Sequence, residues 1–252
     1  MMNRVHVTMA VVAAALAAGV SRAADPPTGE ELLRAMDRNL TFTSRTSRMR
    51  MTVEGRRTRT YELVSFARGE EDAAIEYVHP PRDKGTRMLK LAGELWIYLP
   101  AVDRVQKISG HMLRQGMMGS DLSYEDLMTS RETEKRYRAT MTGEDTLDGR
   151  TCWKVELLAR DDTVSYPKRV MWVDREALLP VKQELYALSG MLLKTWTMSD
   201  VKEYEGGRRF PGKMTIRDHV KKDSVTRIEF KEIRFGVELE KETFSLRWLE
   251  RR

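Results

Sequence analysis

The sequence contains a single cysteine, Cys152, among 252 residues. No intrachain disulfide can form, so the stability of the fold must come from the burial of apolar side chains. Cys152 precedes Trp153 in a run with the alternation of a strand. We therefore interpret it as a small buried apolar residue rather than as a reactive thiol.

The short motifs of common catalytic and nucleotide-binding sites are also missing. There is no Gly-x-Ser-x-Gly elbow, no phosphate-binding glycine loop and no dinucleotide fingerprint. Three histidines follow the N-terminal segment, and none has the spacing of a zinc site. They are His79, His111 and His219. The sequence therefore predicts no cofactor, no metal site and no enzymatic activity.

One catalytic alternative stays open. His111 lies near Asp121 and Glu125 in the sequence, and a histidine beside a carboxylate can act in general acid-base catalysis. Carboxylates close to a helix start are also explained by capping and by the helix dipole. A hydrolase that uses His111 with Asp121 or Glu125 is the less favoured interpretation.

An excess of charge of one sign is absent as well. The chain has 44 basic and 38 acidic residues, mixed along its length, which is typical of a solvated surface rather than of a nucleic-acid-binding stripe. The basic pairs at residues 56–57 and 221–222 are interpreted as charges at strand ends. We expect no nucleic acid among the partners.

The only long apolar run is at the N-terminus. Residues 1–4 include Arg4, residues 5–20 are apolar and rich in alanine, and Ser21 and Ala23 supply small residues for cleavage. This pattern predicts a secretory signal peptide over residues 1–23 and a mature domain over residues 24–252. An uncleaved anchor is the alternative, but the run is short for a membrane span. Cleavage after Ala23 would lower the net charge from +6 to +4.

No cysteine stands at this junction. That argues against a lipid-anchored product, and we expect a soluble protein in a bacterial periplasm or outside the cell.

A helix is predicted after Thr28, a candidate N-cap with Glu31 three residues on. Apolar residues then recur at helical spacing at Leu32, Leu33, Met36 and Leu40. A second short helix is predicted around residues 123–128.

Almost all of the remaining chain alternates apolar and polar residues with period two, which is typical of strands. Turn residues such as Gly93 and Gly149 separate the runs. The predicted strands cover residues 48–53, 59–66, 73–78, 86–91, 94–99, 137–142, 151–158, 168–173, 181–188, 191–200, 213–220 and 224–233.

About a dozen antiparallel strands and one N-terminal helix predict a mainly β fold. We expect a single, strongly curved antiparallel sheet that forms an incomplete barrel. The N-terminal helix and a lid made of a loop and a short helix would cover an apolar cavity. Two sandwich domains divided near Thr140 are the alternative, but no long linker separates the halves.

Methionine is abundant, with 16 residues against 6 phenylalanines. Methionine repacks around variable apolar shapes, so positions predicted to face inward are candidates for the wall of a binding cavity. An ordinary core filled by methionine is the alternative. The candidates are Met49, Met51, Trp96, Tyr98, Met171, Trp172, Trp196 and Met214.

Residues 107–128 form a long, apolar segment punctuated by Gly110, Gly116 and Gly119. Such loops usually have a function, and we interpret this one as a lid hinged at its glycines. Ser120 or Asp121 is expected to cap its short helix. A packed loop without a ligand is equally compatible. The lid candidates are Met112, Leu113, Met117, Met118, Leu122, Tyr124 and Leu127.

The same segment carries a resemblance to a known family. Ile-Ser-Gly-His-Met at residues 108–112 and Met-Gly-Ser-Asp-Leu-Ser-Tyr-Glu-Asp-Leu at residues 118–127 resemble bacterial outer membrane lipoprotein-sorting proteins of the LolA-like group. Leu-Trp-Ile-Tyr-Leu-Pro at residues 95–100 supports it. Further support comes from residues 80–86 and 209–211.

This resemblance implies an incomplete barrel whose cavity holds the acyl chains of a lipid or lipoprotein. It also implies a periplasmic carrier, transient contact with a membrane or membrane protein, and a transporter of the resistance-nodulation-division superfamily as a possible partner. A carrier is the leading hypothesis. An accessory protein that docks on such a transporter without carrying lipid is the second.

Overall fold

The computed structural model describes residues 26–69, 71–128, 133–162 and 164–251. The predicted signal peptide and its cleavage site after Ala23 lie outside these residues. Within the described residues, no helix is both long enough and apolar enough to cross a bilayer.

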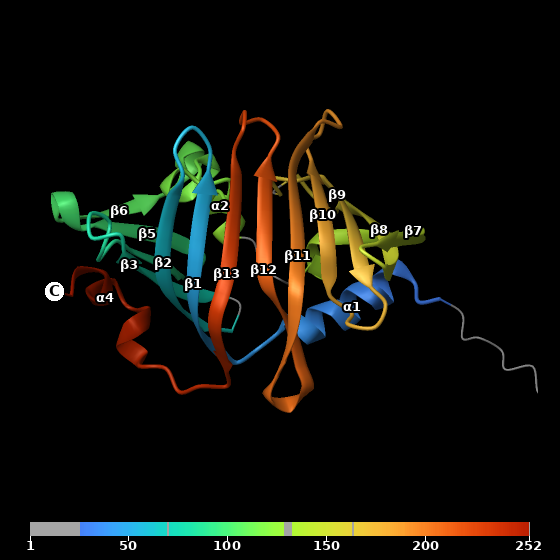
Figure 1. Ribbon diagram of the computed structural model, residues 1–252, viewed down its shortest axis with the longest axis horizontal. Coiled ribbons are helices and arrows are strands. Elements are labelled where there is room, and N and C mark those ends of the chain that lie inside the picture. Colours follow the sequence, from blue (N-terminus) through green and yellow to red (C-terminus); the bar gives the residue numbers. More distant parts are fainter. Residues whose placement is uncertain (1–25, 70, 129–132, 163, 252) are drawn as a thin grey trace, which may run out of the picture.

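The described residues form one antiparallel sheet of 13 strands (Figure 1). Its strand order is β6-β5-β4-β3-β2-β1-β13-β12-β11-β10-β9-β8-β7. The bounds are β1 (Ser44–Glu54), β2 (Arg59–Arg68), β3 (Asp72–His79), β4 (Arg87–Leu91), β5 (Glu94–Leu99), β6 (Arg104–Ile108), β7 (Tyr137–Leu147), β8 (Arg150–Ala159), β9 (Lys168–Asp174), β10 (Pro180–Tyr186), β11 (Leu192–Tyr204), β12 (Arg208–Asp218) and β13 (Val225–Phe235).

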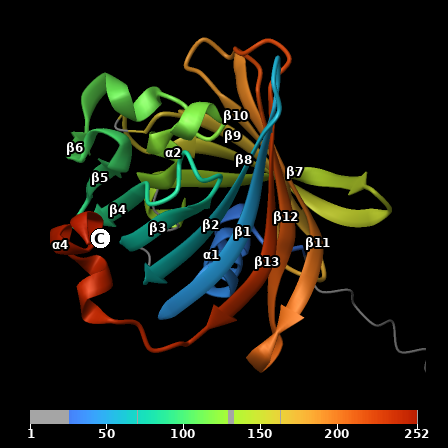
Figure 2. The ribbon, with the colours of Figure 1, turned by 60° about the vertical axis from the view of Figure 1, so that its left-hand side comes forward.

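The first and last strands of the chain, β1 and β13, pair in the middle of the sheet. The chain runs outward from β1 to the edge strand β6, crosses to the opposite edge strand β7, and returns inward to β13. The sheet is strongly bent but is not closed into a barrel (Figure 2). The crossing therefore brings the chain from one edge of the sheet to the other.

Short helical elements make up much of this crossing. They are η2 (Gly110–Arg114), η3 (Met117–Gly119), α2 (Tyr124–Met128) and α3 (Thr133–Arg136). The predicted single curved sheet is confirmed, as is a short helix near residues 123–128. Because Thr140 lies inside β7 and β7 belongs to the sheet, the alternative of two separate sandwiches is wrong.

The predicted N-terminal helix is confirmed as α1 (Gly29–Leu40). Thr28 and Glu31 form a capping box, in which each side chain accepts a hydrogen bond from the other residue's backbone N–H. Leu32, Leu33 and Met36 lie on its buried face and pack into an apolar cluster with residues of β7, β8 and β9. The helix thus covers one part of the concave side (Figure 2).

Strand β6 and two short helical elements near the C-terminus were not predicted. Within β6, Ile108 alone is buried, as expected for a short polar edge strand, so the strand lacks a clear alternation. Its last two residues, 107 and 108, lie in the segment predicted as a loop. Near the C-terminus, η5 (Lys241–Phe244) and α4 (Leu246–Glu250) place Phe244 and Trp248 in an apolar cluster with β4 and β5. The expectation for Cys152 is confirmed, since it is fully buried and burial raises the pKa of its thiol.

Candidate ligand-binding cavity

A largely apolar cavity of about 350 Å³ lies between the sheet and the crossing segment. Its size is at the lower end of the range of about 300–1,000 Å³ that is typical of small-molecule sites. The wall combines side chains from strands that are far apart in the sequence. They include Met49, Met51, Leu63, Ile75, Met171, Leu185, Trp196, Met198, Phe210, Met214, Ile228 and Phe230.

Five of the eight predicted cavity residues line this space: Met49, Met51, Met171, Trp196 and Met214. Met51 pairs in register with Ile228 of β13, and Met214 pairs with the same isoleucine from β12. The central strands β1, β13 and β12 therefore bring these methionines to one stretch of wall, which is how residues about 160 positions apart come together.

The predictions for Trp96, Tyr98 and Trp172 are wrong. Successive residues of a strand point to opposite faces, so Met171 and Trp172 cannot both face the cavity. Trp172 lies on the other face, where its Nε1–H donates to Asp145 at 2.9 Å. In β5, Leu95 and Ile97 join the inner core, whereas Trp96 and Tyr98 pack with the cluster around Trp248. The predicted phase of β5 was shifted by one residue.

The crossing segment supplies one side of the cavity, as predicted for a lid. Met117, Leu122 and Leu127 line the space. The other predicted lid residues pack against or within the same inner core without lining the cavity. These are Met112, Leu113, Met118 and Tyr124.

The glycines of the segment do not all serve the same purpose. Gly110 and Gly119 adopt positive φ angles of 56° and 75°, which favour glycine. Gly116 has an ordinary φ of −66°, but a Cβ there would lie 2.2 Å from the carbonyl oxygen of Ser120. Gly116 therefore permits close packing of the backbone on itself, which differs from the predicted role as a hinge.

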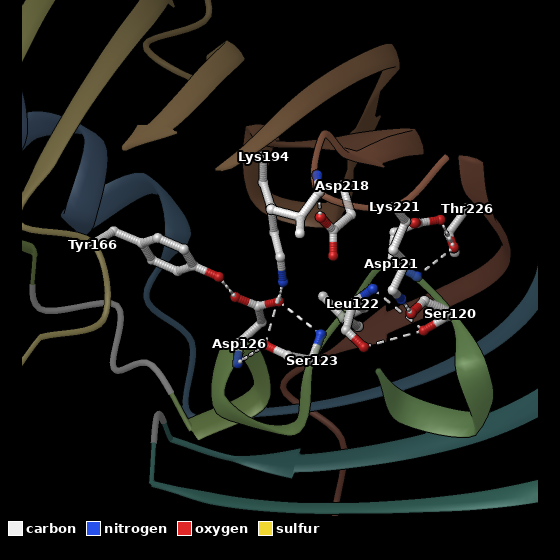
Figure 3. Close-up of polar contacts among 11 residues, drawn as sticks. Ser120, Asp121, Leu122, Ser123, Asp126, Tyr166, Lys194, Asp218, Lys221 and Thr226 are labelled. Atoms are coloured by element: carbon white, nitrogen blue, oxygen red, sulfur yellow. Dashed lines mark hydrogen bonds and ion pairs between the residues drawn. The ribbon is translucent and has the colours of Figure 1, made fainter. Parts of the chain in front are cut away.

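Buried polar contacts attach this segment to the sheet (Figure 3). The backbone N–H of Asp121 donates to Thr226 Oγ1 at 2.8 Å, and the Thr226 hydroxyl donates to the Asp121 carboxylate at 2.7 Å. Ser224 donates a second hydrogen bond to that carboxylate at 3.0 Å. The Lys221 ammonium donates to the Ser120 carbonyl oxygen. The β12–β13 end of the sheet thus fixes the middle of the segment.

Neither Ser120 nor Asp121 caps α2, contrary to the prediction. Ser123 does so, because its Oγ accepts from the N–H of Asp126 at 3.2 Å while Asp126 accepts from the N–H of Ser123 at 2.7 Å. Asp121 is instead held by β13 and its turn, and His111 is exposed in η2. The geometry therefore gives no support to an acid-base pair of His111 with Asp121.

Asp126 also anchors a buried charged cluster (Figure 3). Its carboxylate forms an ion pair with Lys194 Nζ of β11 at 2.5 Å, and the side chains of both residues are less than 10% exposed. The hydroxyl of Tyr166 donates to the same carboxylate at 2.7 Å. Burial, together with the negative charge of Asp126, raises the pKa of Tyr166 far above its ordinary value.

Arg169 of β9 lies next to this cluster and lines the cavity. Its guanidinium carbon is 4.5 Å from the ring centre of Tyr137 and 5.6 Å from that of Tyr166. The residue is 9% exposed, and its buried Nε–H has no hydrogen-bond acceptor. Burial lowers the pKa of this guanidinium.

Sequence reasoning missed Arg169, Lys194 and Tyr166. The alternation of the strands carried a usable signal, because Arg169 is two residues before Met171 and Lys194 is two residues before Trp196. Residues two apart in a strand share a face. A charged residue in phase with a predicted cavity residue was therefore a candidate for a buried polar group.

Comparison with known proteins places this architecture in a family. A family model with the description "Uncharacterized protein" matches residues 69–251. The chain belongs to this family. No match was found among curated protein sequences.

Solved structures of other proteins show which fold this chain shares. A DUF1329 family protein from Desulfovibrio piger is similar at 24% identity and a TM-score of 0.80, with 88% of this chain and 97% of that chain covered. A domain described as an outer membrane lipoprotein-sorting protein, from Vibrio parahaemolyticus, has 25% identity, a TM-score of 0.79 and coverage of 88% and 98%. The LolA superfamily protein NE2245 from Nitrosomonas europaea has 21% identity, a TM-score of 0.72 and coverage of 88% and 100%. The predicted LolA-like fold is confirmed.

Proposed function

We propose that this protein is a periplasmic carrier that binds the acyl chains of a lipid or lipoprotein in its cavity and moves them across the envelope without catalysis. The observation that carries the proposal is a methionine-rich cavity between the sheet and a separately anchored segment. A similar fold in a protein described as lipoprotein-sorting supports a carrier kind of function. Export by a cleaved signal peptide remains a prediction from the sequence.

The energetics of transfer fit such a cavity. Each buried methylene group contributes about 0.8 kcal/mol, so a free acyl chain cannot cross water readily, whereas a chain in the cavity stays out of water. Methionine side chains adapt to chains of different shape. Release would need the crossing segment to move, or an acceptor that buries the chain equally well.

A direct test is the uptake of a fluorescent fatty-acid probe by delipidated protein. Met214→Glu places a carboxylate in the apolar wall, where burial without a partner is costly, so we expect probe affinity to fall at least about tenfold. Met191→Glu is the matched control, because Met191 is 55% exposed. Equal affinity in Met214→Glu and wild type would contradict the proposal.

The alternative accessory role makes a different prediction. Wild-type protein would take up no probe, yet it would co-purify with a membrane transporter from its own envelope. A transporter of the resistance-nodulation-division superfamily as the partner of the carrier stays a prediction from the family resemblance.

A further inference from the structure

The register of three neighbouring strands places two cations in one row of the cavity side. Arg169 of β9 pairs with Leu185 of β10, and Leu185 pairs with Lys194 of β11. Arg169 is on the same face as Met171, which lines the cavity. The row therefore brings two positive side chains to the same face of the sheet, with an apolar residue between them, and Arg169 of this pair lines the cavity.

The two cations differ in whether a nearby carboxylate balances their positive charge. Lys194 has the Asp126 carboxylate at 2.5 Å. Arg169, within the described residues, forms no ion pair with a carboxylate, and its nearest aromatic partners are the neutral rings of Tyr137 and Tyr166. The three charged groups Arg169, Lys194 and Asp126 thus leave one positive charge without an acidic partner, held in a site that is largely closed to water.

The other acidic groups of the wall do not balance this charge. Asp126 is already bound to Lys194, and Asp72 forms an ion pair with Arg68 at 2.7 Å. A buried charge is costly unless it is paired and hydrogen-bonded. A guanidinium is well suited to bind a carboxylate or a phosphate, and the Nε–H of Arg169 is buried without an acceptor.

We propose that Arg169 binds the anionic head of an acyl ligand whose chain lies against the methionine side of the cavity, which we define as Met49, Met51, Met214 and Ile228. The charged side is defined as Asp126, Tyr166, Arg169 and Lys194. This inference rests on the proposed function and names its ligand class: a single-chain amphiphile with a carboxylate or phosphate head.

The test compares three ligands of equal chain length, namely dodecanoate, dodecyl phosphate and uncharged dodecanol, by displacement of an uncharged fluorescent acyl probe at neutral pH. We expect one of the two anions to bind at least about tenfold more tightly than dodecanol, which corresponds to one charge-assisted hydrogen bond. Whether dodecanoate or dodecyl phosphate binds more tightly identifies the head group.

Arg169→Gln should reduce the affinity for the preferred anion at least about tenfold while the affinity for dodecanol changes less than about twofold. Arg169→Lys should retain part of the preference. Arg175→Gln is the matched control, because Arg175 also stacks on an aromatic ring, Trp153 at 4.2 Å, but does not line the cavity. Circular dichroism melts check that each variant folds.

Equal binding of dodecanol and both anions by wild type would overturn the inference and leave the proposed function intact. An anion preference that survives in a folded Arg169→Gln variant would also overturn it. If Arg169→Gln does not fold, the inference is tested by two other results: the preference of wild type for an anion, and the partial retention of that preference in Arg169→Lys. Failure of all three ligands and of the probe to bind would instead contradict the carrier function itself.

Discussion

The methionine side and the charged side of the cavity are built from the same sheet by different physical means. The methionine side consists of apolar side chains from β1, β12 and β13 that pack without directional bonds. On the charged side, Asp126 is fixed by an ion pair at 2.5 Å and a hydrogen bond at 2.7 Å. One side can repack around a variable chain, whereas the other holds its groups in one geometry.

Under the proposed function, the two sides would have different tasks in binding an acyl ligand. Apolar burial is non-directional and roughly proportional to area, so the methionine side would set affinity while tolerating different chains. Directional polar contacts discriminate among head groups, because a poorly matched head leaves buried polar groups without partners. The two sides can be separated by mutation, and the largest effect is expected on the charged side.

Removal of one partner of the buried ion pair should be the most damaging change. Asp126→Ala leaves Lys194 without its carboxylate and Tyr166 without its acceptor. We expect a loss of about 3–5 kcal/mol in the free energy of unfolding, measured by urea denaturation. The double variant Asp126→Ala with Lys194→Met should recover a large part of this loss, since it removes the unpaired charge. No recovery in the double variant would mean that Asp126 acts mainly through other contacts.

On the methionine side, Met51→Ala should cost about 2–5 kcal/mol, because Met51 is 1% exposed and its truncation leaves a void. The comparison of the methionine side with the charged side also predicts how Met51→Ala should change ligand affinity. Affinity for the anion and for dodecanol should change by the same factor, so the preference for the anion stays as in wild type. Met191→Ala, at an exposed position, is the control and should change stability by less than about 0.5 kcal/mol. A selective loss of anion affinity in Met51→Ala would show that the two sides are not independent.

The sequence was a good guide to the sheet and a poorer one to its faces. Twelve strands and the capped helix after Thr28 follow from local alternation and capping, which depend on neighbouring residues. The face of each strand depends on its partners, and a shift of one residue reverses it. Trp96 and Tyr98 occupy positions predicted to face inward, but they pack in the cluster with Trp248 of α4 on the opposite face.

The charged side was harder to predict for a different reason. Asp126 lies in α2, Tyr166 in the loop before β9 and Lys194 in β11, and nothing local in the sequence pairs Asp126 with the other two residues. Charged residues in alternating strands are normally assigned to the solvent face, since a charge is rarely buried without a partner. Lys194 meets its partner only when the crossing segment brings α2 over β11.

The smallest of the predicted effects on stability concerns Tyr166, and it depends on pH. Tyr166→Phe removes a hydrogen bond to a charged carboxylate, so we expect a loss of about 1.5–3 kcal/mol near neutral pH. Burial raises the pKa of Tyr166, so the folded protein keeps a proton that the unfolded chain releases above about pH 10. The stabilisation is therefore complete below pH 10 and declines as the pH rises.

Other buried tyrosines, including Tyr77 and Tyr137, also have raised pKa values, so wild type should lose stability at alkaline pH through several groups. In Tyr166→Phe, the free energy of unfolding should fall less steeply as the pH rises than in wild type. The two slopes should differ by the linkage of one proton, which is up to about 1.4 kcal/mol per pH unit. Urea denaturation between pH 9 and pH 11 measures both slopes. Parallel curves would mean that the Tyr166 hydroxyl is not held protonated by the charged side. A shallower slope with unchanged affinity for dodecanol would show that this hydroxyl stabilises the charged side without contributing to the apolar burial of the chain.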